Sequence, residues 1–184
     1  MIIGITGTLG AGKGTVAEYL TKKHNFIYLS VRNFIAGEIL KLGLAVNRDT
    51  MTQVANDLRA IHGPNYLVEE LLKQAKLHPK NNIVIESIRS VGEERYLKSQ
   101  DTALWAVDAD INTRYKRIVG RASETDAVSF EKFRADEERE MKSDDPNKQN
   151  LRAVIDMADV VFTNNGTREE LFAEVEEALK KLEK

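Results

Sequence analysis

The nine residues that follow the first apolar run constrain this chain more than any other stretch. They are Gly7, Thr8, Leu9, Gly10, Ala11, Gly12, Lys13, Gly14 and Thr15. Glycines let a loop between a strand and a helix turn its backbone N–H groups toward an anion, and the positive end of the helix dipole adds to the attraction. We interpret the stretch as a P-loop, in which Lys13 reaches the β- and γ-phosphates of ATP. The alternative is a glycine-rich turn that binds nothing, but the order of strand, loop and helix favours the P-loop.

The residue after the lysine departs from the usual P-loop pattern. Gly14 stands where many P-loop proteins have the Ser or Thr whose hydroxyl binds Mg²⁺. Thr15 is the nearest hydroxyl, and Glu86, at the end of a predicted strand, can hold Mg²⁺ through the water ligands of the ion. We therefore expect Thr15 and Glu86 to be the metal-binding residues. Alternatively, Glu86 caps the helix that follows it.

The composition is that of an ordinary globular domain. A chain of 184 residues suits one domain with a sizeable core, and its net charge is −2. We therefore expect neither nucleic acid nor a membrane as a partner. The absence of cysteine excludes disulfides, thiolate catalysis and cysteine-bound metals. It is compatible with the cytoplasm, where we expect the protein to act as a monomer or weak dimer. We expect the apolar N-terminus to be a buried strand and not a targeting signal.

Hydrophobic patterning predicts alternating strands and helices. Apolar runs predict strands at about residues 1–6, 26–29, 83–86, 103–107 and 160–163. Helical patterns start near residue 15 and recur at about 33–43, 50–62, 64–77, 91–99, 110–121, 129–142, 150–157 and 167–183. This order predicts a single three-layer α/β domain with a five-stranded parallel sheet and right-handed crossovers. The helical region at about 31–78 can line a second ligand site.

Ligands of such sheets bind outside the carboxyl ends of the strands. Besides the P-loop, that edge would carry Ser30, Glu86, Asp108 and the turn at 164–166. Arg89 follows the strand at 83–86 and can clamp a second phosphate bidentately, or else pair with Glu93. Arg32 and Arg59, in the helical region, are candidates for binding an acceptor phosphate, with Ser30 beside them. A lone arginine is more often a surface residue.

Three arginines share one face of the helix predicted at 110–121. Arg114 can pair with Asp110, and Arg121 with Glu124. Arg117 has no acidic residue three or four positions away, so nothing on its own helix compensates its charge. An anion from elsewhere would do so, and a polyphosphate is the obvious candidate given the P-loop. The alternative is that these are solvated surface arginines.

Two more arginines lie on the helix predicted at 129–142. Acidic neighbours offer Arg134 and Arg139 partners on their own helix, so a surface role and an acceptor-binding role are equally open. Histidines show no zinc-ligand or triad spacing; they are His24, His62 and His78.

With these residues identified, the chain resembles the P-loop nucleotide kinases, the superfamily of adenylate kinase and dephospho-CoA kinase. The loop "GTLGAGKGT" is similar to the adenylate-kinase form, and "KRIVGR" is similar to the start of that family's lid. The resemblance implies that Arg117 packs on the adenine side of ATP, that Arg121 reaches its phosphates, and that Arg89 in "IESIRS" binds the acceptor. "FTNNGT" resembles the adenine-contacting turn of dephospho-CoA kinases, which implies such a contact for Asn165. The whole arrangement looks most like the dephospho-CoA kinase-related proteins of archaea.

The resemblance also has departures. The acceptor segment "LSVRNF" lacks the acidic residue often found there, "ESIRS" lacks a glycine and a proline, and the lid at about 122–128 is short and without a Cys₄ metal site. We expect an ATP- and Mg²⁺-dependent kinase that acts on a small nucleotide acceptor, and we favour a nucleoside or deoxynucleoside monophosphate as that acceptor. In it Lys13, Arg117 and Arg121 stabilise the transferring group. The alternatives are a dephospho-CoA kinase-like enzyme and an ATP-hydrolysing switch.

Overall fold

The computed structural model describes residues 1–75, 82–121 and 129–183, without the side chain of Arg121. The strands are β1 (Ile2–Gly7), β2 (Ile27–Ser30), β3 (Ile83–Glu86), β4 (Ala103–Asp108) and β5 (Val160–Thr163). The helices are α1 (Lys13–His24), α2 (Val31–Lys41), α3 (Arg48–His62), α4 (Tyr66–Ala75), α5 (Val91–Lys98), α6 (Ile111–Arg121), α7 (Phe130–Met141), α8 (Leu151–Asp156) and α9 (Arg168–Leu182). The predicted lid at about 122–128 lies outside the described residues.

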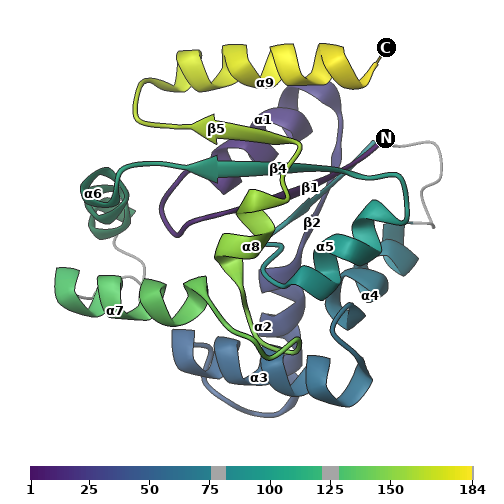
Figure 1. Cartoon of the computed structure of the whole chain (residues 1–184), viewed down its shortest axis with the longest axis vertical. Helices are drawn as coiled ribbons and strands as arrows, with labels where there is room; N and C mark the ends of the chain where they lie inside the picture. The colour runs from purple at the N-terminus through teal and green to yellow at the C-terminus, as the bar shows by residue number, and fades with distance from the viewer. Residues whose placement is uncertain (76–81, 122–128, 184) are drawn as a thin grey trace.

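The strands form one parallel sheet in the order β2-β3-β1-β4-β5, which confirms the predicted five-stranded architecture (Figure 1). The strand β3 is buried along its whole length, as its continuous apolar run predicts for an inner strand covered on both faces. The register of the strands brings their carboxyl ends together, since Ser30 lies opposite Glu86 and Asp108 lies opposite Thr163. The polar residues of four strands therefore share one edge of the sheet.

Alternate residues of the strands pack into two apolar cores, one on each face of the sheet. On one face, Ile3 and Trp105 pack with side chains of α1 and α9. On the other face, Ile83 and Ile85 pack with side chains of α2, α4 and α8. Figure 1 shows the same division, with α1 and α9 together on one side and α2 to α5 on the other. The helices of the second layer include the region expected to bind an acceptor.

Capping side chains set where several helices begin. The hydroxyl of Ser30 accepts a hydrogen bond from the backbone N–H of Asn33 at 3.2 Å, so α2 starts at Val31 directly after β2. Ser90 and Glu93 form a capping box at the start of α5, which fixes the turn that carries Arg89. The strand-to-helix turns on this edge are therefore held by local hydrogen bonds.

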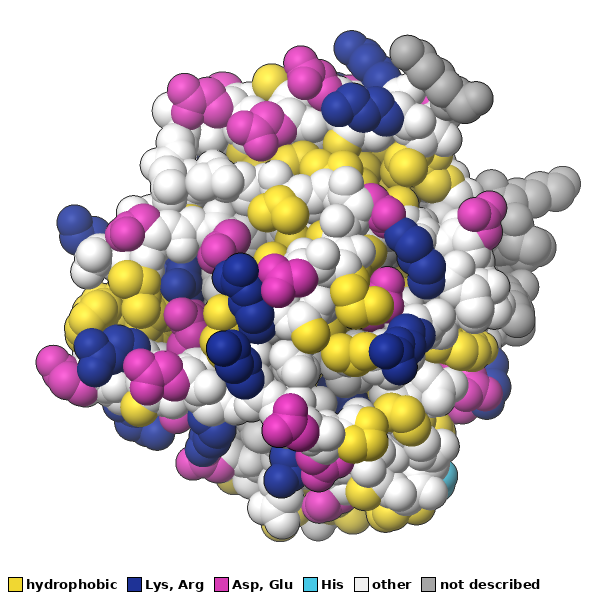
Figure 2. All heavy atoms as spheres, viewed as in Figure 1, with side chains coloured by type: hydrophobic (Ala, Val, Ile, Leu, Met, Phe, Trp, Pro, Cys, Tyr) yellow, Lys and Arg dark blue, Asp and Glu magenta, His cyan; other side chains and the backbone are white. Residues whose placement is uncertain are grey.

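The visible surface mixes charges of both signs. On the face drawn in Figure 2, Lys and Arg side chains stand among Asp and Glu side chains, in keeping with the net charge of −2. Over the described ranges, none of the helices combines the length and apolarity that crossing a bilayer requires.

A polar cluster joins α1 to α9 on the far side from the strand ends. The Glu176 carboxylate accepts hydrogen bonds from the Tyr19 hydroxyl at 2.5 Å and from His24 Nε2 at 2.9 Å, and Lys23 Nζ lies 3.2 Å away. The bonds from Tyr19 and His24 lower the pKa of Glu176 from 4.5 to about 2. The ionised carboxylate is therefore the form that ties these two helices together.

We expect Glu176→Gln to lower the free energy of unfolding by about 1 kcal/mol at pH 7, a modest value because the side chain is 27% exposed. A carboxyl group whose pKa is lowered by folding stabilises the protein above pH 4.5 and loses that effect as the pH falls toward 2. Urea denaturation at pH 7 and pH 3 should therefore show the difference from wild type shrinking at the lower pH. Glu174→Gln, exposed on the same helix, is the control, and an equal loss at both pH values would contradict the prediction.

Candidate functional site

The P-loop connects β1 to α1 and requires glycine at several bends. Gly7 and Gly12 have φ angles of 134° and 111°, which side chains rarely tolerate. A Cβ atom at Gly7 would lie 1.9 Å from the carbonyl oxygen of Val107, and one at Gly12 would lie 2.4 Å from Nδ2 of Asn164. The loop is thus pressed against β4 and against the turn after β5, which leaves no room for larger residues.

The start of α1 is open to an anion. Gly12 is its N-cap and provides no side-chain capping bond, and the first turn carries no acidic residue. The backbone N–H groups of that turn and the helix dipole are therefore available to a phosphate. Lys13 Nζ donates to the carbonyl oxygens of Gly7 at 3.0 Å and Thr8 at 2.8 Å, so the ammonium group lies over the loop. Thr15, the predicted metal-binding hydroxyl, is half-buried in the same turn, beside the exposed Gly14.

Arg117 lies against the P-loop. Its Nη1 donates to the carbonyl oxygen of Asn164 at 2.9 Å and to that of Ala11 at 3.5 Å. Lys13 and Arg117 therefore come from different helices to the same loop. Arg121 ends α6, and its side chain lies outside the description.

Arg114 is buried and has a different partner from the one expected. Its guanidinium pairs with Glu137 of α7, not with Asp110, and donates to the carbonyl oxygen of Leu9 at 3.3 Å. The Asp110 carboxylate instead accepts hydrogen bonds from the N–H groups of Asn112 and Thr113 at the start of α6. The predicted ion pair between Arg114 and Asp110 does not form, because an aspartate at a helix N-terminus accepts hydrogen bonds from the free N–H groups there. Arg114 thus holds the P-loop in place through the carbonyl group of Leu9.

Asn164 is a site residue that the sequence analysis did not single out. It is buried, and its Nδ2 donates to the carbonyl oxygen of Ala11 at 2.7 Å. Asn165, the predicted adenine contact, is exposed, and its Oδ1 accepts a hydrogen bond from the N–H of Asp110 at 2.7 Å. Successive residues of a strand face opposite sides of the sheet, and in β5 Phe162 is buried while Thr163 is exposed. Continuing this alternation predicts a buried residue at 164 and an exposed one at 165, which would have distinguished the two asparagines.

We expect Asn164→Ala to weaken ATP binding about tenfold, because a buried hydrogen bond that fixes the loop contributes roughly 1–1.5 kcal/mol. Asn165→Ala, the matched control one residue along, should change the affinity about threefold at most. Titration calorimetry with ATP and Mg²⁺ measures both. A larger loss for Asn165→Ala would instead favour the adenine contact that the resemblance implies.

Two acidic residues at strand ends flank the loop. Glu86 accepts a hydrogen bond from the Tyr28 hydroxyl at 3.1 Å, and burial together with the charge of Glu86 raises the pKa of Tyr28. Asp108 accepts a hydrogen bond from the Thr8 hydroxyl at 2.6 Å, so it braces the P-loop. In the described part of the chain, no three His, Cys, Asp or Glu residues gather as a metal site. Mg²⁺ commonly takes only one or two carboxylates and completes its shell with phosphate oxygens and water, so the role predicted for Glu86 and Thr15 does not require such a cluster.

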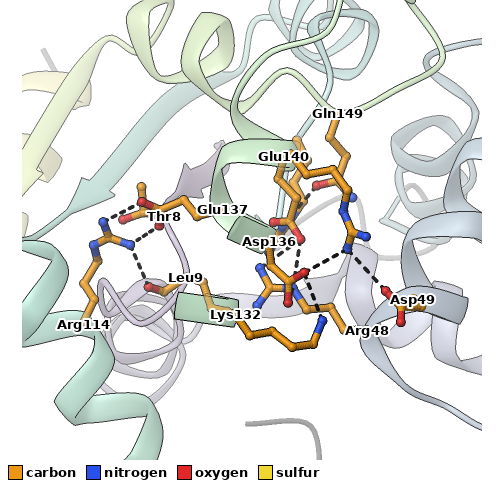
Figure 3. A network of polar contacts seen from close by, with 12 residues as sticks. Thr8, Leu9, Arg48, Asp49, Arg114, Lys132, Asp136, Glu137, Glu140 and Gln149 are labelled. Carbon is orange, nitrogen blue, oxygen red and sulfur yellow. Dashed lines mark hydrogen bonds and ion pairs between the residues drawn. The ribbon is translucent and has the colours of Figure 1, made fainter. Parts of the chain in front are cut away.

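A pocket opens beside Leu9 of the P-loop, between α2, α3 and the end of α7. Its volume is about 720 Å³ when the open solvent at its mouth is included, and about 100 Å³ of that is enclosed. Four arginines line it, Arg32, Arg48, Arg59 and Arg89, together with Glu140 and Gln149. Figure 3 shows Arg48, Glu140 and Gln149 in one polar network next to Leu9. Arg48 was not predicted, whereas Arg32, Arg59 and Arg89 were.

The remaining predicted acceptor residues are placed differently. Ser30 is buried and caps α2. Arg134 is exposed on α7, lies 3.5 Å from Glu138 of its own helix, and does not line the pocket described above. Arg89 meets Glu93 only through its backbone N–H, at 2.9 Å, so its guanidinium is directed to the pocket.

Arg59 forms a buried ion pair with Glu93. Its guanidinium is 1% exposed and donates to Glu93, which is fully buried, at 2.9 and 2.7 Å. Glu93 in turn accepts hydrogen bonds from the backbone N–H groups of Arg89 and Ser90. Arg59 therefore stabilises the turn after β3 through Glu93, at the base of the pocket.

We expect Arg59→Met to lower the free energy of unfolding by about 3–5 kcal/mol, because Glu93 would stay buried with its charge uncompensated. The double variant Arg59→Met/Glu93→Gln should recover part of the loss, whereas two independent residues would give additive losses. Urea denaturation of the two single variants and the double variant measures this coupling. Full additivity would contradict the structural role.

The strand order and the loop after β1 together define a three-layer α/β protein with the P-loop kinase fold. A family model described as "AAA domain" matches residues 3–143. The UPF0200 protein of Methanococcus vannielii is 32% identical over 184 residues, covering 98% of this chain and 96% of that relative. The UPF0200 protein of Thermococcus kodakarensis is 29% identical over 181 residues, covering 95% and 94%. The chain belongs to the UPF0200 family and carries the AAA domain named by the family model.

Solved structures share the fold. TT1252 from Thermus thermophilus matches with a TM-score of 0.64 and 23% identity, covering 99% of this chain and 97% of that one. Shikimate kinase from Aquifex aeolicus matches with a TM-score of 0.55 and 19% identity, covering 100% and 96%. At these identities the likeness establishes the architecture, and the chemistry has to be argued from the residues of this chain.

Proposed function

We propose that this protein is an ATP- and Mg²⁺-dependent kinase that transfers the γ-phosphoryl group to a nucleoside or deoxynucleoside monophosphate. One observation carries the proposal: Leu9 belongs to the P-loop and also lines the arginine-rich pocket, so donor and acceptor sites would adjoin. The partner is then a small molecule, and the protein acts in the cytoplasm as a monomer or weak dimer.

The roles proposed for the residues of the ATP site follow from where negative charge develops during phosphoryl transfer. Phosphoryl transfer spreads negative charge over the equatorial oxygens, so catalysis depends on positioning and on electrostatic stabilisation. Lys13 and Arg117 already lie at the loop and would stabilise the transferring group, with Arg121 as a further candidate. Thr15 and Glu86 would hold Mg²⁺, which when bound neutralises phosphate charge. The loop N–H groups would orient the triphosphate.

The pocket favours a phosphate acceptor over a hydroxyl acceptor. A hydroxyl needs a general base, while a phosphate is already ionised at neutral pH. Of the described residues that line the pocket, Glu140 is the one carboxylate. Burial raises its pKa, but Arg89 and Arg48 outweigh burial and hold the pKa below its usual value, which makes it a weak base. This argues against the dephospho-CoA kinase alternative, whose acceptor is a sugar hydroxyl.

Labelled ATP, offered with nucleoside monophosphates, dephospho-CoA or water alone, tests the proposal, which expects label in a nucleoside diphosphate. Lys13→Met and Arg117→Gln should each lower kcat about 10²–10³-fold, since each removes a charge that stabilises the transition state. The matched controls are Lys22→Met, exposed on α1, and Arg152→Gln, exposed on α8, which should retain activity. Label in CoA, or only in free phosphate, would contradict the proposed acceptor, and full activity of Lys13→Met would contradict the donor site.

A further inference from the structure

Glu140 holds two of the pocket arginines at once. Its Oε1 accepts hydrogen bonds from Nε and Nη2 of Arg48 at 3.1 and 3.0 Å, and its Oε2 accepts one from Nη1 of Arg89 at 2.5 Å. The Glu140 side chain is 5% exposed, and the side chains of Arg48 and Arg89 are 18% and 20% exposed. Gln149 accepts a further hydrogen bond from Arg89 at 3.1 Å. The pocket wall thus contains a nearly desolvated anion between two cations, and Figure 3 shows Glu140 with one of them, Arg48.

The three residues come from separate parts of the chain. Arg48 begins α3, Arg89 lies between β3 and α5, and Glu140 is the last but one residue of α7. Two arginines directed at one point would repel each other without an anion between them. A phosphate group matches this arrangement, because planar guanidinium groups bind tetrahedral oxyanions bidentately.

Resting on the kinase function proposed above, we propose that Glu140 is a specificity-determining residue that occupies the place of the acceptor's phosphate between Arg48 and Arg89. An acceptor must displace the carboxylate to reach both arginines. Because Glu140 is tethered to the pocket, its effective concentration there is high, and a neutral or weakly charged group competes poorly. A dianionic phosphate monoester competes best, so the carboxylate selects acceptors by charge.

The exchange can take place without loss of α7. One turn before Glu140, Glu137 pairs with Arg114. Two turns before it, Phe133 is fully buried against the ring of Tyr115. These contacts anchor the helix independently of the pocket. Rotation of the Glu140 side chain is therefore enough to uncover both arginines.

A purely structural ion pair makes a different prediction. Removing the charge of Glu140 would then destabilise the protein and create no affinity for anions. Under our proposal the same change leaves Arg48 and Arg89 facing the pocket, with Asp136, 3.7 Å from Arg48, as the nearest remaining carboxylate, so it creates an anion site. Phosphate binding, measured without ATP and without turnover, separates the two.

Orthophosphate is the probe, and Lys13→Met is the background, because that change removes the P-loop lysine as a competing phosphate ligand. Titration calorimetry should show Glu140→Gln binding orthophosphate at least tenfold more tightly than the background. Glu138→Gln, which removes an equal charge from an exposed position on α7, should match the background. Adding Arg48→Gln to Glu140→Gln should abolish the gain.

A gain of less than twofold for Glu140→Gln, or an equal gain for Glu138→Gln, overturns the proposal. If Glu140→Gln does not fold alone, the proposal predicts that phosphate restores a cooperative unfolding transition and that chloride at equal ionic strength does not. If phosphate does not restore the transition, the proposal is also overturned. Glu140→Asp keeps the charge on a shorter side chain and should show a smaller gain in the same direction. The readout is independent of catalysis, so failure of phosphoryl transfer in the acceptor panel is a separate result.

Discussion

The structure depends on how the P-loop carbonyl groups are held. A loop that presents its N–H groups to an anion must turn carbonyl groups the other way, and those groups need partners of their own. Lys13 binds the carbonyls of Gly7 and Thr8, Arg114 binds that of Leu9, and Asn164 binds that of Ala11. Side-chain donors bound to these carbonyls thus keep the N–H groups of the loop directed at the site.

This requirement links the loop to the rest of the sheet. The side chains that hold it come from α1, from α6 after β4, and from the turn after β5, which lie close together only because the strands are parallel and end at one edge. The close approach of Gly7 to Val107 has the same origin, since β1 and β4 are paired there. A shift in strand register would therefore remove the partners of the loop as well as the sheet contacts.

Patterns local in sequence predicted most of the fold and only part of the site. Apolar runs located all five strands, and the glycine spacing located the P-loop, because both depend on neighbouring residues. The partner of Arg114 was missed, since helical spacing suggests Asp110 while Glu137 lies 23 residues away. Arg48 and Glu140 carry no local signal at all, because they are 92 residues apart and meet only where the fold brings the start of α3 to the end of α7. Ion pairs between helices follow from topology, which periodicity alone does not supply.

The charge balance explains why a nearly neutral chain can contain an arginine-rich pocket. Buried or half-buried cations need anions nearby, and α7 supplies them to its surroundings: Glu140 to Arg48 and Arg89, and Glu137 to Arg114. Net charge therefore says little about local anion binding, because carboxylates of the fold itself match Arg48, Arg59 and Arg89 in the pocket. A site built in this way binds an external anion by exchange, so its affinity is the difference between two similar interactions and its selectivity depends on the charge of the competitor.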